Sequence, residues 1–333
     1  MPLPALLSRP LSPPRTLAPR CRRSLAGLAA TVVEAQGHRA TVLLHASGRR
    51  LQCQLRHAQR QRDAREGQEH FVIGDRVRVA ERVAGAAAGR PVALVAAREP
   101  RTRTMRRRLT AHSQPAIATH VDQLVVVSAV QPPPNRGLLD RFLVLAAAEG
   151  IDALLVLNKV DLGGRALAEA RETLAPYARV GYRTHELSVE RGTGLAELRQ
   201  LLAPAAGHLS VLAGHSGVGK SSLVNSLLPG ALLPTDELSV SRRGFRGRHI
   251  TTRRTCHLLA VGSQEGQASV ERRAVCYFDR GAEPSQPDGC TWPTDGAMVV
   301  DTAGVRSFGL LGMRPSVLAH GFVEFRELLP HCR

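Results

Sequence analysis

Lysine is nearly absent from this 333-residue chain, which contains only Lys159 and Lys220. The other forty-three basic residues are all arginines, so almost every position that requires a positive charge accepts a guanidinium. A lysine side chain offers a compact ammonium on a flexible stem, which a planar guanidinium does not reproduce. We therefore expect both lysines to lie where the chemistry requires an ammonium.

Long apolar runs and paired cysteines are missing as well. The apolar runs are far shorter than the roughly 20 residues that a membrane helix needs. The six cysteines form no C-x-x-C pair and no spacing typical of a metal site, and no secretory signal precedes them. This pattern argues against a membrane-spanning chain and against a disulfide framework, and it is typical of reduced thiols in an intracellular compartment.

Acidic residues are too few to balance the arginines, which leaves a formal net charge of +17 and a pI of about 11.2. Such a charge favours a polyanionic partner, nucleic acid first. Compositional drift towards arginine, alanine and glycine is the alternative origin of the charge. The length suggests about two domains, with enough residues for a buried core.

Residues 1–27 contain no acidic side chain, since the first one is Glu34, and they combine arginines with serine and proline. This composition is typical of a transit peptide, so we expect import into an organelle. The proline and serine content favours the chloroplast over the mitochondrion. The alternative is a disordered basic tail that binds RNA.

Residues 28–112 have the pattern of a small β-barrel followed by a basic linker. Five short apolar stretches separated by glycines predict a five-stranded barrel of the OB type. Aromatic residues, 3% of the chain, are scarce here apart from Phe71, so contacts to RNA would fall mostly to arginines. A β-barrel without RNA binding remains the alternative. The expected strands are 29–35, 40–45, 50–56, 75–81 and 91–97, and the linker is 98–108.

Residues 113–312 alternate apolar runs with helical stretches, which predicts an α/β domain with a mostly parallel sheet. A polar insert without clear periodicity, 262–296, interrupts this pattern and is expected on the surface. The expected strands are 123–130, 153–158, 208–213 and 297–301, and the expected helices are 138–150, 165–178 and 194–202.

A glycine-rich phosphate-binding loop follows the strand 208–213. Its glycines allow backbone N–H groups to surround phosphate oxygens, while the helix that follows contributes its dipole. Lys220 would bind the outer phosphates and Ser221 would bind Mg²⁺. The nucleotide-binding residues predicted here are Gly214, His215, Ser216, Gly217, Val218, Gly219, Lys220, Ser221 and Ser222.

The second nucleotide motif, Asn158-Lys159-Val160-Asp161, ends another apolar strand. The carboxylate of Asp161 would accept from the N1–H and 2-amino donors of guanine, a donor pair that adenine lacks. Together with the phosphate-binding loop, this motif indicates GTP rather than ATP.

Two weaker motifs complete the predicted site. Asp301 would hold Mg²⁺ through water, and the amide of Gly304 would sense the outermost phosphate. A switch threonine, either Thr251 or Thr252, would complete the Mg²⁺ shell, and the sequence leaves that choice open. The base motif precedes the phosphate loop, so the motif order is that of a circularly permuted domain, which close termini allow.

The ordered motifs VDQLVVVSAV, LLDRFLVLA, LNKVDL, GHSGVGKSSLVNSLLP, GRHITT and DTAGVRSFGL closely resemble a known family. This family comprises the circularly permuted GTPases of ribosome biogenesis that depend on the small ribosomal subunit, known as the RsgA type. The resemblance covers roughly residues 28–333 and implies an OB domain on ribosomal RNA, a central GTPase and a C-terminal zinc domain. It also implies GTP hydrolysis that accompanies release from the maturing small subunit, and a base-backing motif at Ser188. Ile250, Ala303 and Val189 depart from the family pattern.

The favoured function is therefore a GTPase that assists late assembly of the small ribosomal subunit, binds its rRNA and is stimulated by the subunit. We expect the protein to be a monomer. One alternative is an RNA-binding scaffold that holds GTP without significant turnover. Another is an ATP-dependent kinase, which leaves the base motif unexplained.

Slow intrinsic hydrolysis is expected because Val305 lies where many GTPases carry a water-orienting glutamine. His249, directly before the switch threonines, is the candidate catalytic residue, and a loop histidine without a role is the alternative. Six arginines and no acidic residue lie between Glu237 and Glu265, which suits a loop that docks on RNA.

Residues 313–333 resemble the start of the family's zinc domain, with a helix expected over 322–333 and Cys332 at the first ligand position. A structural zinc site needs four protein ligands. We expect no stoichiometric zinc for this chain, because Cys256, His257, Cys276 and Cys290 have unsuitable spacing. A longer, zinc-binding product is the expected form of the protein.

Overall fold

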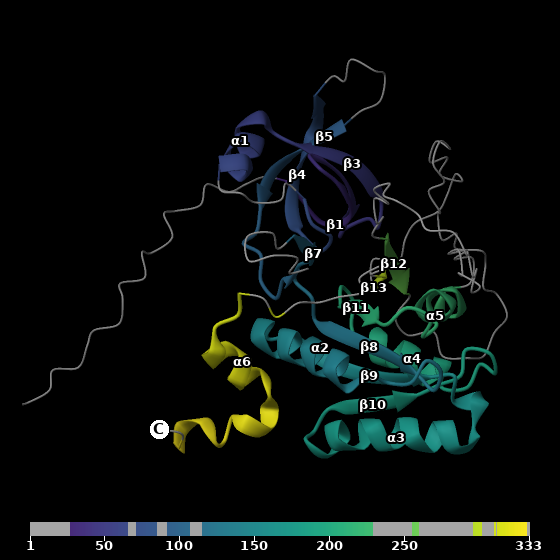
Figure 1. Ribbon diagram of the computed structural model, residues 1–333. Helices are drawn as coiled ribbons and strands as arrows, with labels where there is room; N and C mark the ends of the chain where they lie inside the picture. The colour runs from purple at the N-terminus through teal and green to yellow at the C-terminus, as the bar shows by residue number, and fades with distance from the viewer. Residues whose placement is uncertain are drawn as a thin grey trace, which may run out of the picture.

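The computed structural model consists of a β-barrel placed against one edge of an α/β sheet (Figure 1). It describes residues 27–65, 71–84, 92–106, 115–228, 255–259, 296–301, 310 and 312–331. Within these segments, every helix is too short or too polar to cross a bilayer.

Five strands close the N-terminal barrel in the order β1-β2-β3-β5-β4, with helix α1 (His57–Arg65) between β3 and β4. All neighbours are antiparallel except β3 and β5, so the expected five-stranded OB-type barrel is confirmed. Phe71 is buried in the barrel core, where its ring is not accessible for stacking on a base. The strands are β1 (Leu28–Gln36), β2 (Arg39–Leu44), β3 (Arg50–Leu55), β4 (Arg76–Ala84) and β5 (Val92–Arg98).

The second unit is a six-stranded sheet in the order β10-β9-β8-β11-β13-β12. It is parallel except for the edge strand β12, which pairs antiparallel with β13. Strands β10 and β12 were not expected from the sequence, because β10 is short and polar and β12 is a five-residue edge strand. The strands are β8 (Gln123–Ala129), β9 (Asp152–Asn158), β10 (Arg183–Glu186), β11 (Leu209–Gly214), β12 (Thr255–Leu259) and β13 (Ala297–Asp301).

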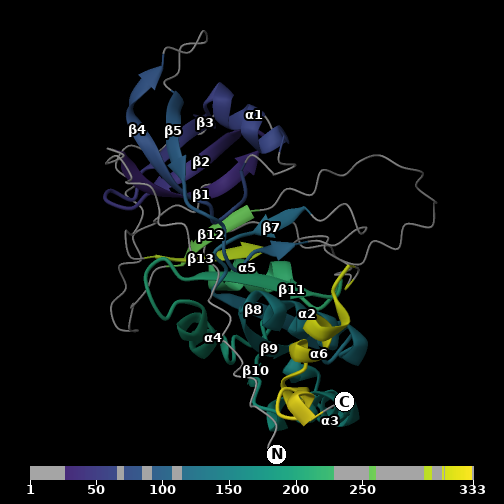
Figure 2. The ribbon, with the colours of Figure 1, turned by 90° about the vertical axis from the view of Figure 1, so that its left-hand side faces the viewer.

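Helices cover both faces of this sheet, as parallel strands with crossover connections require. Buried side chains of α2 and α3 share one hydrophobic cluster, and those of α4 and α5 share another on the opposite face. Figure 2 shows the barrel above the sheet, with α2 and α4 on opposite sides of it. The helices are α2 (Arg136–Glu149), α3 (Gly164–Arg179), α4 (Leu195–Leu202) and α5 (Lys220–Leu227).

Several arginines of the basic linker between the two units form ion pairs with carboxylates. It contains the short strand β6 (Met105–Arg106), which pairs with β7 (Ala116–Ala118). Because Arg98, Arg101 and Arg103 are engaged with carboxylates of the protein, these three arginines are poor candidates for RNA contacts. The ion pairs are Arg98–Asp63 at 3.1 Å, Arg101–Asp75 at 2.7 Å and Arg103–Asp122 at 2.7 Å.

The C-terminal segment packs along α2. Helix α6 (Pro315–Gly321) comes so close that a Cβ on Gly321 would lie 2.7 Å from Val144. The helix expected over 322–333 is instead two 3₁₀ turns, η2 (Val323–Phe325) and η3 (Leu329–His331), within the described residues. This part of the sequence prediction was wrong, and Pro330 provides a reason, since it has no N–H to continue a helix.

Several sequence predictions lie outside the described residues and stay predictions. They concern the transit peptide, the polar insert, the candidate catalytic histidine, the switch threonines and the orphan zinc ligand. The residues in question are 1–26, 262–295, His249, Thr251, Thr252, Gly304 and Cys332.

Candidate functional site

The phosphate-binding loop lies between strand β11 and helix α5, as the sequence predicts. At two positions of this loop, other parts of the chain come so close that only glycine fits. A Cβ on Gly214 (φ 150°) would lie 2.2 Å from the Val127 carbonyl oxygen, and one on Gly219 (φ 91°) would lie 2.5 Å from Asn158 Nδ2. Side chains at these positions would push the loop away from the rest of the site.

Lys220, the first residue of α5, folds back over the loop. Its Nζ donates to the carbonyl oxygens of Gly214 and His215, both at 2.8 Å. Burial lowers the pKa of Lys220, and the nearby charge of Asp301 opposes that effect. Two carbonyls therefore hold the ammonium in position, where a phosphate group would exchange for them as acceptor.

The base motif contacts the phosphate loop directly, although about sixty residues separate them in the sequence. Asn158 Nδ2 donates to the Val218 carbonyl oxygen at 2.9 Å. Lys159, in the left-handed region at φ 62°, donates from Nζ to the carbonyl oxygens of Gly217 and Gln131, each at 2.8 Å. These bonds bring the two predicted nucleotide motifs into one site, and they place each of the two lysines in it.

Asp161 and Ser188 meet at the rim of this site. The Ser188 hydroxyl donates to Asp161 Oδ1 and accepts from the Arg191 backbone N–H at 3.1 Å. The Val189 N–H points to Asn158 Oδ1 at 3.4 Å. The predicted base-backing loop is thus next to the base motif. It binds the Asp161 carboxylate through Oδ1, and among the described residues Oδ2 has no hydrogen-bond donor, so it can accept from a ligand.

Asp301 ends strand β13, paired in register with Leu212 of β11. Its side chain is buried, and Oδ1 has no hydrogen-bond partner among the described residues. Burial raises the pKa of Asp301, although the positive charge of Lys220 opposes the shift. A buried carboxylate oxygen without a partner fits a cation or a metal-bound water. Ser221 lies in the first turn of α5, so these two residues fit the predicted Mg²⁺ site.

The structure adds one part of the site that sequence reasoning missed. The Gln131 carbonyl oxygen, in the loop between β8 and α2, accepts the second hydrogen bond from Lys159 Nζ. A proline run, Pro132–Pro134, follows it, and this run was the only signal in the sequence for an ordered loop at this point.

Among the described residues, no three His, Cys, Asp or Glu side chains form a metal cluster, and the prediction about zinc is not tested by this part of the chain.

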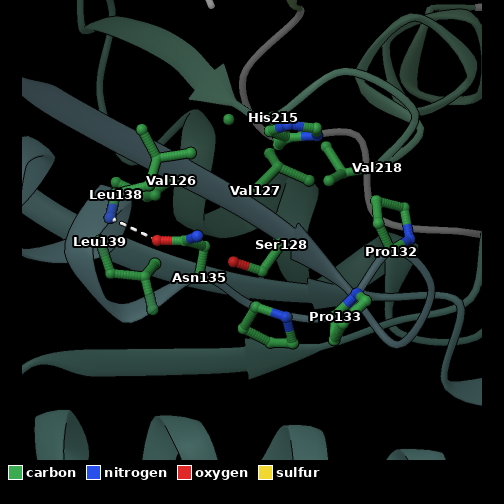
Figure 3. A pocket seen from close by; sticks show the side chains of 12 residues that line it. Val126, Val127, Ser128, Pro132, Pro133, Asn135, Leu138, Leu139, His215 and Val218 are labelled. Atoms are coloured by element: carbon green, nitrogen blue, oxygen red, sulfur yellow. Dashed lines mark hydrogen bonds between the residues drawn. The ribbon is translucent and has the colours of Figure 1, made fainter. Parts of the chain in front are cut away.

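A cavity of about 210 Å³ lies beside the phosphate loop (Figure 3). Its walls are the end of strand β8, the proline run, the start of α2 and the outer side of the loop. Lys220, Ser221, Asp161 and Asp301 do not line it. The polar lining side chains are Ser128, Asn135 and His215.

The fold and the site together define a circularly permuted P-loop protein whose base motif precedes its phosphate loop. The family model for the RsgA GTPase matches residues 98–264, about half of the chain. This chain belongs to the RsgA GTPase family.

Curated relatives extend over the same region. A protein from Azotobacter vinelandii named small ribosomal subunit biogenesis GTPase RsgA is 38% identical over 218 residues, which are 65% of this chain and 52% of the relative. A protein of the same name from Chromohalobacter salexigens is 34% identical over 265 residues, 80% of this chain and 65% of the relative. The chain thus spans about half to two thirds of the length of the curated relatives it matches.

Solved structures give the same fold. The crystal structure of YjeQ from Thermotoga maritima matches with a TM-score of 0.60 and 25% identity, over 90% of this chain and 83% of that one. The crystal structure of YloQ, a circularly permuted GTPase, matches with a TM-score of 0.54 and 20% identity, over 94% of this chain and 84% of that one. The predicted circular permutation and barrel are confirmed.

Proposed function

We propose that this protein hydrolyses GTP to GDP and phosphate, and that it acts in the biogenesis of the small ribosomal subunit. The observation that carries this proposal is the hydrogen-bonded contact of the base motif with the phosphate loop, through Asn158 and Lys159. That contact holds the predicted guanine-binding motif against the predicted phosphate-binding loop. Membership of the RsgA GTPase family and the names of the curated relatives support the biological role.

In this function each described residue has a binding or positioning role. Asp161 would accept from the two donors on the guanine edge, with Ser188 holding the carboxylate in place. Lys220 would exchange its two carbonyl acceptors for phosphate oxygens. Ser221 and Asp301 would hold Mg²⁺, which offsets phosphate charge when it is bound.

Replacing Asp161 by asparagine tests the base assignment, because the amide presents donors where guanine also presents donors. We expect Asp161→Asn to weaken GTP binding by about 10- to 100-fold, because a mismatched buried hydrogen-bonding group costs about 1–3 kcal/mol, and to leave ATP binding unchanged. Competition binding with GTP and ATP measures this. Retained preference for GTP would contradict the role of Asp161.

For the hydrolytic step, we propose that His249 orients the attacking water once the small subunit orders the loop that carries it. Val305, at the position of the usual glutamine, has no group that could do so. His249→Ala should bind GTP normally and lose subunit-stimulated turnover. Turnover that survives in this variant would remove His249 from the mechanism.

The deciding experiment for the function as a whole is GTP turnover with and without purified bacterial-type small subunits. Stimulation by the subunits supports a GTPase assembly factor. The second candidate, an RNA-binding scaffold that holds GTP, predicts subunit binding without hydrolysis even in a single turnover. The net charge of +17 favours this second candidate, because a strongly positive protein binds RNA.

We also propose that the six arginines between Glu237 and Glu265 contact the rRNA of the subunit. Counterion release makes such contacts salt-dependent, so affinity should fall by orders of magnitude between about 50 and 200 mM salt. A filter-binding series at increasing salt measures the slope. A flat salt dependence would show that the basic surface is not the docking surface.

A further inference from the structure

The cavity beside the phosphate loop includes two polar side chains, Ser128 and Asn135, that have no role in the proposed function. Ser128 is only 7% exposed, and its hydroxyl forms no hydrogen bond with the described residues. Asn135 caps helix α2, because its Oδ1 accepts from the Leu138 N–H at 3.0 Å, which leaves the Nδ2 donors to the cavity side. Figure 3 shows Asn135 and Ser128 on one side of the cavity and His215 on another.

The tautomer of His215 follows from its own hydrogen bond. Nδ1 lies 2.8 Å from the Ser216 carbonyl oxygen, and a carbonyl only accepts, so Nδ1 carries the proton. In the neutral ring Nε2 is then an acceptor. The described lining therefore offers the buried Ser128 hydroxyl and, from two exposed side chains, the Asn135 amide as a donor and His215 Nε2 as an acceptor.

The rest of the wall is apolar. It consists of aliphatic side chains and proline rings, which suit the faces of a flat ring better than a charged or extended group. Among the described residues that line the cavity there is no carboxylate, lysine or arginine, so an anion or a cation would find no opposite charge on this part of the wall. The apolar lining residues are Val126, Val127, Pro132, Pro133, Pro134, Leu138, Leu139 and Val218.

We propose that this cavity is a binding site for a small neutral ring that carries a carbonyl next to an N–H, that is, a lactam. The carbonyl accepts from Asn135 Nδ2 and from the Ser128 hydroxyl, while the ring N–H donates to His215 Nε2. The apolar edge of the ring packs against Leu138 and the proline run. Pyrimidine and purine bases with a carbonyl belong to this chemical class.

This site adjoins the nucleotide site and shares the phosphate loop with it. Gly214 and His215 line the cavity, and their carbonyl oxygens are the two acceptors of Lys220. When a nucleotide draws the Lys220 ammonium to its phosphates, those two peptide groups lose a partner. Ligand in the cavity and nucleotide on the loop therefore influence each other, and thermodynamic linkage makes the effect equal in both directions.

The direct test is an NMR titration of the nucleotide-free protein with 2-pyridone, the smallest ring of this class. A ligand of about seven heavy atoms should bind with a dissociation constant on the order of millimolar. The amide signals of Gly214 and His215 should shift, and N-methyl-2-pyridone, which lacks the N–H, should bind at least tenfold more weakly. Unmoved amide signals, or equal binding of the two probes, would overturn the proposal.

Two variants assign the contacts. Asn135→Asp keeps the helix cap, because aspartate is an equally good N-cap, and replaces the amide donor by an acceptor. Ser128→Ala removes the hydroxyl. Each should weaken 2-pyridone binding several-fold with an unchanged melting temperature, whereas Arg165→Lys, on the exposed start of α3, should leave it unchanged. Wild-type affinity in both cavity variants would overturn the assignment.

The linkage is measured by repeating the titration with saturating GDP, and we expect at least a twofold change in the affinity for 2-pyridone. Identical affinities with and without GDP would overturn the placement of the site against the phosphate loop. The titration without nucleotide does not depend on the proposed function. A protein that binds 2-pyridone and fails to bind GDP would refute the proposed GTPase while retaining the cavity site.

Discussion

At the scale of single residues, the hydrogen bonds of the two lysines explain why these positions are lysine in an arginine-rich chain. Each ammonium donates to two backbone carbonyl oxygens at 2.8 Å, Lys159 to Gly217 and Gln131, Lys220 to Gly214 and His215. A point charge on a flexible stem reaches two carbonyls that converge on one position, whereas a planar guanidinium is bulkier and fixes its donors in a fork. The expectation from the sequence, that both positions require an ammonium, agrees with these contacts.

Lys159→Arg is therefore a sharper test than an alanine substitution, because the positive charge is kept. We expect nucleotide affinity to fall at least about tenfold, since the loss of one or two hydrogen bonds to a charged group costs on the order of 1.5–3 kcal/mol each. Equilibrium binding of a fluorescent GDP measures it. The matched control is Arg165→Lys, an exchange on an exposed surface, and equal loss in that variant would contradict the role of Lys159.

Asp301 has a predicted role in binding Mg²⁺, but its burial lowers the stability of the folded protein. Its folded-state pKa is raised above 3.8, mainly by burial, so its contribution to stability is full below that value and is lost as the pH rises through the folded pKa. At pH 7 the buried carboxylate therefore destabilises the nucleotide-free protein.

Asp301→Asn should consequently raise the melting temperature of the nucleotide-free protein by a few degrees at pH 7, with little difference at pH 4. The same variant should lose Mg²⁺-dependent stabilisation by GTP. Thermal unfolding at the two pH values, with and without Mg²⁺ and GTP, measures both effects. A variant less stable than wild type at pH 7 would show that the attraction to Lys220 outweighs the burial.

At the scale of elements, the sequence is informative wherever apolar periodicity is strong. All five barrel strands and the long helices of the α/β domain were predictable, because short apolar stretches separated by glycines mark the strands and longer apolar-containing stretches mark the helices. β10 lacks this signal, since it is short and has exposed polar residues along a sheet edge. The contacts of Gln131 and the cavity were not predictable either, because they depend on the packing of a loop against a distant motif.

Strand β12 carries a buried titratable group at the boundary with the barrel. His257 is 4% exposed, and its Nε2 has no partner among the described residues. Burial, together with the positive charge of Arg50 from β3, lowers the pKa of His257 to about 4. Because this pKa is depressed, its stabilising contribution is complete above pH 6.5 and is lost as the pH falls towards about 4.

His257→Leu should flatten the dependence of stability on pH in this window, because leucine has no proton to bind. Each pKa unit corresponds to about 1.4 kcal/mol, so the wild-type loss from this residue is on the order of 3 kcal/mol. Urea unfolding of both proteins at pH 7, 5.5 and 4.5 measures the difference. Parallel curves for the two proteins would contradict a buried neutral His257.

At the scale of the whole molecule, the barrel and the sheet share one hydrophobic core. The largest cluster of buried side chains includes Val33, Leu43 and Ile73 from the barrel region, together with Leu124 and Leu209 from the sheet. Gly74 fits so tightly that a Cβ there would lie 2.1 Å from the Thr119 carbonyl oxygen. Asp122 adds polar contacts, since it accepts from Arg103 and from the Leu209 backbone N–H.

A shared core predicts cooperative unfolding of the two units, because neither can open without exposing apolar surface of the other. We expect a single calorimetric transition for the wild type, and we expect Ile73→Ala to lower its midpoint without splitting it. Removal of a buried isoleucine costs about 2–5 kcal/mol, which is large enough to resolve. The matched control is Val32→Ala, whose side chain is buried within the barrel cluster alone. Two separate transitions in the wild type would show that the barrel and the sheet fold independently, and the contacts between them would then be too weak to carry a change at the nucleotide site to the barrel.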